Sequence, residues 1–332
     1  MKQVIVFGAG GWGTALALVL RETGSRPVLV ARRTEFAEKL RADRENRTYL
    51  PGIPLPADLD IASGVPDLGS ARLFVLAVPT QFVRSALTPL AGAFPAELPV
   101  VSVVKGIEVG TLLRVSEVVR DVLGRVKICV LSGPSHAEEV ARRLPTAVVA
   151  ASNYEGLAKQ VQKAFMTERF RVYTHSDMKG VELGGAVKNV IAIAAGICDG
   201  MGLGDNAKAG LVARGLVEIS RLGHAMGARK TTFYGISGMG DLVTTCYSPY
   251  GRNRAVGLAI GKGKTLRQIL GEMKMVAEGV ESTRSVFALA RRVKVPMPIV
   301  EEVHKVLFED KDPKAAVVDL MTRGAKSEVE DF

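Results

Sequence analysis

A lysine and an asparagine interrupt an otherwise apolar stretch in the middle of the chain. Lys188 and Asn189 are the only strongly polar residues between Glu182 and Asp199, and glycines and alanines surround them. A lysine in such a setting costs stability unless it is paired or takes part in chemistry. We therefore interpret Lys188 as an ammonium group that donates a proton to a carbonyl oxygen. The alternative is a lysine whose aliphatic stem is buried while its charged end reaches water.

Two further stretches in the same half of the chain carry polar side chains. Asp241, in GISGMGDLVTTC, is a candidate to orient Lys188 or to hold a substrate hydroxyl, and a helix cap is its alternative role. Gly251, Arg252 and Asn253 open a helix-like stretch in TCYSPYGRNRAVG. Glycine N–H groups, a helix N-terminus and arginine side chains together form a good phosphate site. The alternative for this stretch is a basic cluster on the surface.

The segment VFGAGGWGTALALVL near the N-terminus has the spacing G-x-G-x-x-G. Gly8, Gly10 and Gly13 follow the apolar residues 4–7 directly and precede a stretch with helical periodicity. In this context the first glycine permits a tight turn, the second lets the backbone approach a pyrophosphate, and the third lets the helix pack on the strand. The helix N-terminus adds free N–H groups and a positive dipole end. The pattern therefore predicts a dinucleotide-binding turn.

Neighbouring residues bear on which dinucleotide is bound. Gly11 opens the turn further, and Trp12 either faces the cofactor or packs against the protein. The second predicted strand ends in VLVARRTE, with Arg32 and Arg33 where an NAD-specific fold would place an acidic residue. Two guanidinium groups suit a 2′-phosphate, which favours NADP(H) and leaves NAD(H) as the alternative. The other interpretation of the arginines is an ordinary solvated helix start.

Further candidates follow the other predicted strands, at the edge where ligands bind in open α/β sheets. Lys105 ends VVSVVK and presents an ammonium group next to a glycine. Gly133 and Ser135 follow the strand in VLSGPSHAEEV, and Ser135 with Glu138 matches a capping box. This turn predicts a second anion-binding helix start, unless Ser135 is only a cap.

The order of predicted elements gives the fold class. The predicted strands are Gln3–Phe7 and residues 27–31, 73–78, 100–104, 127–131, 147–150 and 171–173. Nearly continuous apolar strands separated by helical segments, such as 14–21 and 82–90, predict a doubly wound parallel sheet. After about Asp177, helical spacing recurs at 207–226, 281–291 and 298–308. We predict an α/β protein with a dinucleotide-binding Rossmann domain at 1–177, an all-helical substrate and catalytic domain at 178–332, and a frayed polar tail.

Composition limits the remaining classes of function. The net charge of +10 fits an anionic small substrate, and 5% aromatic residues scattered among dispersed basic residues argue against nucleic acid. Cys129, Cys198 and Cys246 predict reduced thiols in the cytoplasm, and the histidine and cysteine spacings predict no metal site. The chain enters a strand at once, so we expect no signal peptide. Because the apolar run 186–197 is short and contains Lys188, we expect no membrane insertion.

In combination, the motifs resemble those of the bacterial NAD(P)-dependent sn-glycerol-3-phosphate dehydrogenases. The resemblance extends over essentially the whole chain and rests on GAGGWGTALA, YLPGIPLP, LAVPTQ, VVKGIE, LSGPSHAEEV, ELGGAVKNVIAIAAGICDGMGLGDNAKA, GMGDLVTTC, GRNR and VAEGVEST. It implies a Rossmann domain and a helical domain with the active site in the cleft between them. It also implies reversible reduction of dihydroxyacetone phosphate to sn-glycerol 3-phosphate for phospholipid synthesis, by an enzyme that is commonly a homodimer.

The resemblance also implies roles for individual residues. Lys188 is similar to the family's general acid/base, and Lys105 to a residue that contacts both cofactor and substrate. The other implied substrate contacts are Gly133, Ser135, Asp241, Gly251, Arg252 and Asn253. The implied cofactor contacts are Gly8, Gly10, Gly11, Trp12, Gly13, Arg32, Arg33, Tyr49, Lys105, Ala137, Arg252, Val276 and Glu278. Gly11 and Gly251 stand where the family commonly has serine, so contacts there must come from backbone N–H groups.

Two other functions compete with this one. A dehydrogenase of the same two-domain build could act on a 3-hydroxy acid, although the predicted phosphate site argues against it. A nucleotide-sensing module or basic repressor would need neither a buried lysine nor Asp241, and the sequence has no recognisable helix-turn-helix.

Overall fold

The computed structural model of the chain describes residues 3–65, 67–273, 276–325 and 327–328. Its contacts divide the chain into two compact units. Unit 1 comprises Met1–Lys105 and Leu113–Met178, and unit 2 comprises Gly106–Leu112 and Lys179–Phe332. The short segment Gly106–Leu112 therefore packs with the helical unit although unit 1 flanks it on both sides in the sequence. Of the polar tail predicted to fray, residues 326 and 329–332 lie outside the described residues.

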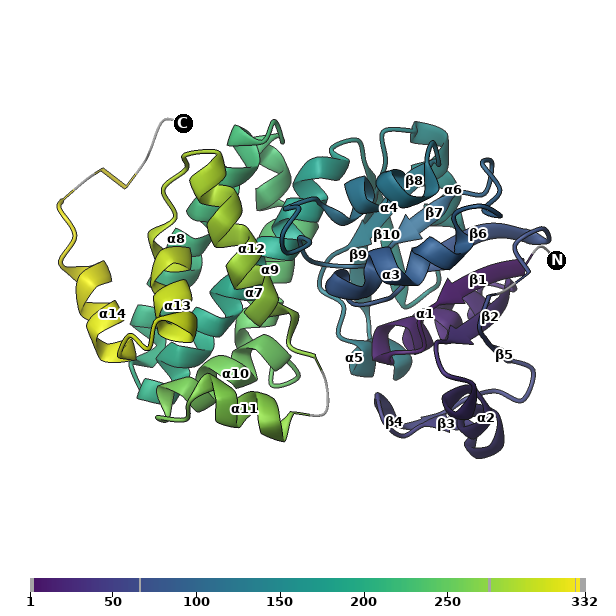
Figure 1. The fold of residues 1–332 in the computed structure, drawn as a ribbon, viewed down its shortest axis with the longest axis horizontal. Coiled ribbons are helices and arrows are strands. Elements are labelled where there is room, and N and C mark those ends of the chain that lie inside the picture. Colours follow the sequence, from purple (N-terminus) through teal and green to yellow (C-terminus); the bar gives the residue numbers. More distant parts are fainter. Residues whose placement is uncertain (1–2, 66, 274–275, 326, 329–332) are drawn as a thin grey trace. The chain divides into compact units, whose positions relative to one another are not determined.

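Unit 1 is built on an eight-stranded sheet, as far as its described residues show, with the order β10-β9-β8-β7-β6-β1-β2-β5 (Figure 1). Its strands are β1 (Gln3–Phe7), β2 (Arg26–Ala31), β5 (Asp60–Ser63), β6 (Ala71–Leu76), β7 (Val100–Ser102), β8 (Ile128–Ser132), β9 (Thr146–Ala151) and β10 (Phe170–His175). A separate hairpin pairs β3 (Glu45–Asn46) with β4 (Leu50–Pro54). The predicted strands are confirmed, whereas β5 and the hairpin had no recognised sequence signal.

Helices connect these strands and cover the sheet. They are α1 (Gly11–Glu22), α2 (Thr34–Asp43), η1 (Thr80–Phe82), α3 (Val83–Leu87), η2 (Thr88–Leu90), α4 (Val115–Leu123), α5 (Ala137–Ala141) and α6 (Glu155–Phe165). The central strand β8 is buried at every position, because a parallel sheet covered on both faces needs apolar side chains on both. The core of unit 1 is a hydrophobic cluster of its own, separate from that of unit 2.

The strand order reverses between β1 and β6. From β1 the chain continues outward to β2 and then β5, whereas β6, β7 and β8 extend in the other direction, and the strands from β5 to β8 are parallel. In doubly wound sheets a ligand crevice forms at such a reversal, beyond the carboxyl ends of the strands. The glycine-rich turn follows β1 directly, so the topology places it at this point.

One strand pair departs from the predicted doubly wound parallel sheet. β8 and β9 are antiparallel, whereas the other described pairs of the eight-stranded sheet are parallel. The connection between them contains only the five-residue helix α5, which packs on α1 instead of crossing the sheet. A parallel pair needs a crossover that returns the chain to the end of the sheet where the first strand began, and this connection does not return there because its helix packs on α1.

From Lys179 onward, the regular elements in the described residues of unit 2 are all helices, and they are built around α7 (Met178–Met201). The other elements are α8 (Gly204–Ala225), η3 (Lys230–Tyr234), the π-helical turn η4 (Ile236–Gly240), α9 (Asp241–Tyr247), α10 (Arg252–Gly261), α11 (Leu266–Glu272), α12 (Glu278–Arg292), α13 (Pro298–Phe308) and α14 (Pro313–Met321). Of the described helices, α7 alone has the length and composition to cross a membrane, and its apolar window is wholly buried in the structure. The helix is longer than the apolar run in the sequence indicated, and it forms the core of the unit.

Glycines let α7 and α10 approach very closely. A Cβ atom on Gly257 of α10 would lie 1.9 Å from the carbonyl oxygen of Ile193, and one on Gly196 of α7 would lie 2.1 Å from that of Arg254. Real Cβ atoms do not come this close to backbone atoms, so only glycine fits at either position. The seam fixes the beginning of α10 against the middle of α7.

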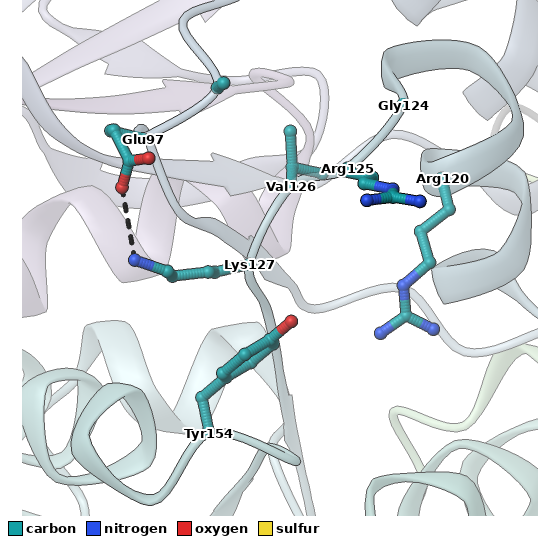
Figure 2. A pocket seen from close by; sticks show the side chains of 8 residues that line it. Glu97, Arg120, Gly124, Arg125, Val126, Lys127 and Tyr154 are labelled. Atoms are coloured by element: carbon teal, nitrogen blue, oxygen red, sulfur yellow. Dashed lines mark hydrogen bonds and ion pairs between the residues drawn. The ribbon is translucent and has the colours of Figure 1, made fainter.

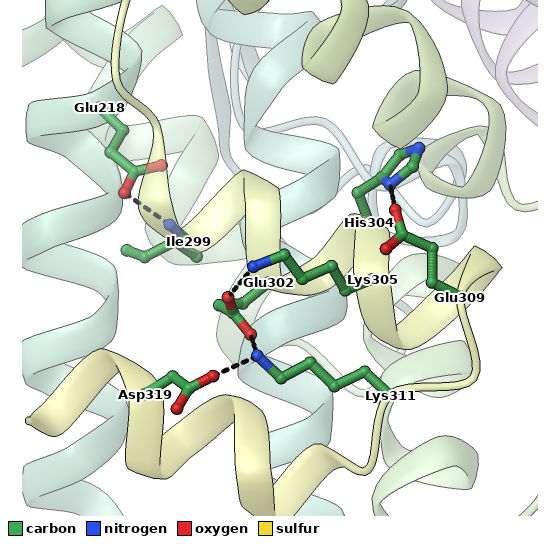
Figure 3. A network of polar contacts seen from close by, with 8 residues as sticks. All are labelled: Glu218, Ile299, Glu302, His304, Lys305, Glu309, Lys311 and Asp319. Atoms are coloured by element: carbon green, nitrogen blue, oxygen red, sulfur yellow. Dashed lines mark hydrogen bonds and ion pairs between the residues drawn. The ribbon is translucent and has the colours of Figure 1, made fainter.

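A polar network joins α13 to its neighbours (Figure 3). Glu218 of α8 is buried and accepts hydrogen bonds from the N–H groups of Ile299 (2.7 Å) and Val300 (3.3 Å). It thus caps the first turn of α13 from another helix. Burial raises the pKa of Glu218 to about 7, although the two N–H groups oppose this shift. About one turn further along α13, Glu302 pairs with Lys311, whose ammonium also bonds Asp319 of α14.

Candidate functional site

The structure gives each glycine of the G-x-G-x-x-G motif a distinct role. Gly8 has φ +122°, and a Cβ there would lie 2.4 Å from the carbonyl oxygen of Ala77 after β6. A Cβ on Gly13 would lie 1.9 Å from the Gly8 oxygen. By contrast, a Cβ on Gly10 would meet no described atom within 4 Å. Gly8 and Gly13 are therefore required by the protein's own packing, whereas open space at Gly10 fits the close approach of a ligand.

The N-terminus of α1 has the properties of an anion site. Gly10 is the N-cap residue, and among the described residues no side chain caps the helix and no acidic group lies in its first turn. The first N–H groups of a helix need acceptors that the helix cannot supply. Together with the open space at Gly10, this arrangement fits the pyrophosphate of a dinucleotide.

Gly11 and Trp12, both predicted to contact the cofactor, also pack against other parts of unit 1. A Cβ on Gly11 would lie 2.6 Å from the carbonyl oxygen of Tyr49 and 3.6 Å from the Cβ of Ala137. Gly11 thus permits the hairpin to pack against the turn, which explains why serine is absent here. Trp12 is half-buried and packs at 6.4 Å from Phe170, and its Nε1 is buried without a partner among the described residues.

Asn46, which the sequence did not single out, holds the turn in place. Its side chain is fully buried, and its Nδ2 donates to the carbonyl oxygen of Ala9 (3.1 Å) and to Oγ1 of Thr14 (2.8 Å). Its Oδ1 accepts from the N–H of Tyr49 (3.1 Å). The amide therefore connects the β3–β4 hairpin to both ends of the segment Gly10–Gly13. A single asparagine in a polar loop carries no sequence signal for this role.

Arg32 and Arg33 follow β2, the strand that pairs with β1 in parallel register. Both side chains are exposed, and Arg33 is the N-cap residue of α2 without a side-chain capping bond. The carboxyl ends of β1 and β2 lie at the same edge of the sheet, so the glycine turn and the two guanidinium groups belong to one edge. This placement is compatible with a 2′-phosphate.

Lys105, Gly133 and Ser135 form a cluster at the carboxyl ends of β7 and β8. The Nζ of Lys105 donates to the carbonyl oxygen of Gly133 (2.8 Å) and to Oγ of Ser135 (3.2 Å). The predicted capping box is wrong, because α5 begins at Ala137 with His136 as its N-cap. Gly133 has φ +145° and the Ser135 hydroxyl folds back onto its carbonyl oxygen (2.7 Å), so that hydroxyl is used inside the cluster.

Lys188 is buried in unit 2 and held by two side chains of α9. Only 5% of Lys188 and 1% of Asp241 are exposed, and Nζ lies 2.5 Å from Oδ1 of Asp241 and 2.5 Å from Oγ1 of Thr245. The interpretation of a lysine whose charge reaches water is therefore wrong. Thr245 was missed, although its position four residues after Asp241 puts the two on one helix face. A buried ammonium oriented by a carboxylate and a hydroxyl is suited to proton transfer.

The stretch predicted to bind phosphate stands at the N-terminus of helix α10, where the sequence predicted a helix start. Gly251 is the N-cap residue, Arg252 is exposed, and its guanidinium donates to the carbonyl oxygen of Val276 (3.0 Å). Asn253 is buried, and its Oδ1 accepts from the N–H of Gly279 (2.9 Å) in the first turn of α12, which begins at Glu278.

The α10 turn and the lysine cluster are connected within unit 2. A Cβ on Gly279 would lie 2.8 Å from the Asn253 side chain and 2.9 Å from the carbonyl oxygen of Asn189. Gly279 therefore packs between the side chain of Asn253 and the backbone of Asn189, the residue that follows Lys188 in α7.

Arg254, the last residue of the Arg-Asn-Arg run, has a different role. Its Nε bonds Oδ2 of Asp199 (2.6 Å), and both carboxylate oxygens of Asp199 also accept from the Nζ of Lys208 (2.9 Å). Lys208 in turn lies over the ring of Tyr247 at 4.3 Å. Lys208 is buried and the other two charges are partly buried, and this group reinforces the glycine seam between α7 and α10. Arg254 is therefore engaged within the protein, which leaves Arg252 as the exposed guanidinium of the run.

A separate pocket lies at the opposite end of the sheet (Figure 2). It has a volume of about 360 Å³ and is lined by residues that precede β7 and β8, among them Glu97, Arg125 and Lys127. Lys127 pairs there with Glu97 at 3.1 Å. Lys105 and Gly133 follow these two strands, at their carboxyl ends. The pocket lies at their amino ends and is therefore not part of the candidate site.

The fold and the two sets of residues define a class, the nicotinamide-dependent dehydrogenases with a Rossmann domain before a helical domain. The chain belongs to the NAD-dependent glycerol-3-phosphate dehydrogenase family. Residues 3–158 match the N-terminal part of that family, and residues 177–318 match the C-terminal part. The sequence-based predictions of the family, of an oxidoreductase and of the α/β fold with a helical second half are confirmed.

Similar proteins cover nearly the whole chain. Glycerol-3-phosphate dehydrogenase (NAD(P)+) 2 of Salinibacter ruber is 52% identical over 330 residues, which are 98% of this chain and 96% of the relative. The enzyme of the same name from Citrifermentans bemidjiense is 49% identical, over 98% of this chain and 99% of the relative. The crystal structure of glycerol-3-phosphate dehydrogenase from Coxiella burnetii has a TM-score of 0.92 at 38% identity, over 97% of this chain and 99% of that one.

Proposed function

We propose that the protein interconverts dihydroxyacetone phosphate and sn-glycerol 3-phosphate by hydride transfer, with NADP(H) preferred over NAD(H). The observation that carries this proposal is Lys188, a buried ammonium bonded to both Asp241 and Thr245. A sugar-phosphate ketone needs a proton donor at its carbonyl oxygen, and the family membership supplies the substrate class. The product supplies the glycerol backbone for phospholipid synthesis.

In this mechanism the nicotinamide, when bound, supplies the hydride that reduces the carbonyl carbon. Lys188 donates its proton to the carbonyl oxygen, and its positive charge stabilises the negative charge that develops there. Asp241 and Thr245 fix the direction of the ammonium group, and the family resemblance makes Lys105 a contact of cofactor and substrate. The reverse reaction uses the neutral amine of Lys188 as the base.

The phosphate of the substrate is held by the α10 turn. The N–H groups at the start of α10 and the exposed guanidinium of Arg252 provide donors and positive charge. Gly251 shapes the turn, since a Cβ there would lie only 3.0 Å from the carbonyl oxygen of Thr245. Its own N–H already donates to the carbonyl oxygen of Ser248 (3.2 Å), so the donors to the phosphate are the N–H groups of the helical residues that follow it. This phosphate site disfavours the competing activity on a 3-hydroxy acid.

The glycine turn and the residues after β2 would hold the cofactor. Gly8, Gly10 and Gly13 would shape the turn for its pyrophosphate, and Arg32 and Arg33 would bind its 2′-phosphate. Tyr49 and Ala137, which pack against Gly11, belong to the same turn, and the family resemblance adds Val276 and Glu278 as cofactor contacts.

The proton-transfer role is tested by single-turnover kinetics with Lys188→Met. We expect the rate of NADPH oxidation with dihydroxyacetone phosphate to fall by about a hundredfold or more. Lys179→Met is the matched control, since Lys179 lies on the same helix and donates to the carbonyl oxygen of Met226. An unimpaired rate in Lys188→Met, or an equal loss in the control, would refute the assignment.

Cofactor preference is tested by comparing NADPH and NADH oxidation in wild type and Arg32→Asp. We expect wild type to favour NADPH and the variant to lose that preference, because the aspartate repels the 2′-phosphate. Arg125→Asp has the same change of charge at the opposite edge of the sheet and should behave as wild type. If wild type and Arg32→Asp both used the two cofactors equally, the assignment of Arg32 to the 2′-phosphate would be refuted.

The remaining expectations stay predictions of the proposed function. The buried free cysteines Cys129, Cys198 and Cys246 support a reducing, cytoplasmic setting. A homodimer is expected from the family resemblance and is checked by light scattering. We expect full activity in a chelator, since no metal takes part, and no salt-sensitive DNA binding. Activity with a 3-hydroxy acid but not with the phosphate would favour the competing dehydrogenase.

A further inference from the structure

We infer that Asn46 is a positioning residue for dinucleotide binding, which holds both ends of the glycine turn so that its N–H groups are prearranged for the pyrophosphate. The inference rests on the proposed function, since it requires the dinucleotide to bind at this turn. Asn46 itself contacts no part of the proposed reaction and acts through the backbone of residues 9–14.

The hydrogen bonds of Asn46 bracket the residues that face the ligand. Its Nδ2 donates to the carbonyl oxygen of Ala9, just before the N-cap, and to the hydroxyl of Thr14, just after the first turn. Between these two points lie Gly10 and the first helical residues Gly11–Gly13. One planar amide therefore sets the distance between the two ends of the anion site.

The hairpin that carries Asn46 is itself rigid. The carboxylate of Glu45 accepts hydrogen bonds from the N–H of Gly52 (2.8 Å) and from Arg47 (3.1 Å), and these bonds lower the pKa of Glu45. The N–H of Tyr49 returns to Oδ1 of Asn46, and the Tyr49 carbonyl lies against Gly11. The support behind the turn is thus a braced hairpin and not a free loop.

The chemistry of the position requires an amide. Both Ala9 O and Thr14 Oγ1 accept from the NH₂ group, and the Tyr49 N–H donates to Oδ1 as well as to the backbone carbonyl oxygen of Asn46 (3.3 Å). A carboxamide carries this donor and this acceptor on one short planar group. Aspartate has the same shape but would direct an oxygen at the Ala9 carbonyl in a fully buried place. Alanine would leave the carbonyl oxygen and the hydroxyl without this donor.

The loss of prearrangement appears as weaker dinucleotide binding. If the turn becomes ordered only when the dinucleotide binds, the free energy of ordering reduces the binding free energy and so weakens the affinity. We expect Asn46→Ala to raise the dissociation constant of NADPH about tenfold, the effect of one buried hydrogen-bonding group. Because the hydrogen bonds of Asn46 go to the glycine turn and to its own hairpin, kcat at saturating NADPH and KM for dihydroxyacetone phosphate should remain within about twofold of wild type.

Trp12 gives a direct readout, since it is the sole tryptophan of the chain and lies within the turn. Bound NADPH absorbs tryptophan emission, so titration of the full-length protein reports binding at this position. Ser152→Ala is the matched control. Ser152 is likewise buried in unit 1, donates to the carbonyl oxygen of Ile128 (2.7 Å) and accepts from the N–H of Tyr154 (3.1 Å), but it lies away from the turn.

A second pair of variants keeps the inference testable if Asn46→Ala folds poorly. Thr14→Val removes one acceptor of the Asn46 amide without changing the size of the side chain, and it should weaken NADPH binding severalfold. Thr14→Ser keeps the hydroxyl and should restore binding. In the double variant with Asn46→Ala, the effect of Thr14→Val should largely disappear, since both substitutions break the same bond.

The outcomes separate the inference from the function beneath it. Weaker NADPH binding in Asn46→Ala and Asn46→Asp, with unchanged binding in Ser152→Ala, supports the inference. Wild-type affinity in both Asn46 variants, or an equal loss in Ser152→Ala, overturns it while the proposed function stands. A wild-type protein that binds no NADPH overturns the proposed function and the inference together.

Discussion

Asp241→Asn is the most informative single change in the lysine cluster. The substitution keeps the size and shape of the side chain and removes its charge, so Lys188 remains next to Thr245 but loses its counter-ion. With 6% and 2% of the two side chains exposed, solvent cannot replace that charge. We expect the variant to lose both catalytic rate and stability.

The geometry sets the size of both effects. At 2.5 Å and an effective dielectric constant of about 20, the attraction between the two charges is about 7 kcal/mol, which is a ceiling because desolvation opposes it. Removal of one partner of a buried pair costs about 3–5 kcal/mol of stability. We expect the lower end, since Thr245 still accepts a hydrogen bond from the ammonium. Loss of an oriented proton donor should reduce kcat by about a hundredfold.

A double variant separates the two effects. Lys188→Met combined with Asp241→Leu removes both charges, and the apolar pair should recover most of the lost stability. Activity should stay as low as in Lys188→Met. Urea unfolding followed by circular dichroism measures the first property, and single-turnover NADPH oxidation the second. A double variant as unstable as the sum of its single changes, or Asp241→Asn with wild-type kcat, would refute the reasoning.

Three further changes probe the packing and electrostatics of unit 2. Gly257→Ala places a methyl group 1.9 Å from a backbone oxygen, so we expect a loss of at least about 1–3 kcal/mol on urea unfolding. Gly271→Ala, where no described atom lies within 4 Å, should instead gain up to about 1 kcal/mol, and equal effects of the two would contradict the glycine seam. Because the pKa of Glu218 is raised in the folded state, the free energy of unfolding falls by about 3 kcal/mol as pH rises from 4.5 to about 7. Above that pH the contribution of Glu218 is constant. Glu218→Gln should therefore gain on wild type in unfolding midpoint across this interval, and a constant difference would show that Glu218 does not titrate there.

The parts of the site that could be predicted depend on local sequence. Gly8 and Gly13 are required by contacts with their own strand–turn–helix unit and the adjacent strand, so the spacing alone is informative. Lys188 stood out because a charge within an apolar helix must be compensated, whatever the fold. The α10 turn was visible because Gly251 and Arg252 combine a helix start with positive charge.

Other parts depend on contacts between distant segments. Asn46 acts on residues more than thirty positions earlier in the chain, and nothing in its own surroundings indicates this. The antiparallel β9 follows from the route of a loop, which periodicity does not encode. The capping box matched by Ser135 does not form because α5 begins at Ala137, and the Ser135 hydroxyl instead donates to the Gly133 carbonyl oxygen and accepts from Lys105. Each of these is decided by tertiary structure.

The packing of Gly106–Leu112 with unit 2 determines which fragments of the protein can fold. The chain passes from one unit to the other between residues 105 and 106, 112 and 113, and 178 and 179. Ile107 is fully buried in the hydrophobic cluster of unit 2, and the carbonyl oxygen of Thr111 accepts a hydrogen bond from Arg292. A fragment that begins at Lys179 would therefore have a hole in its core. A transplantable helical module must carry this seven-residue insert with it, and a single proteolytic cut cannot release the module whole.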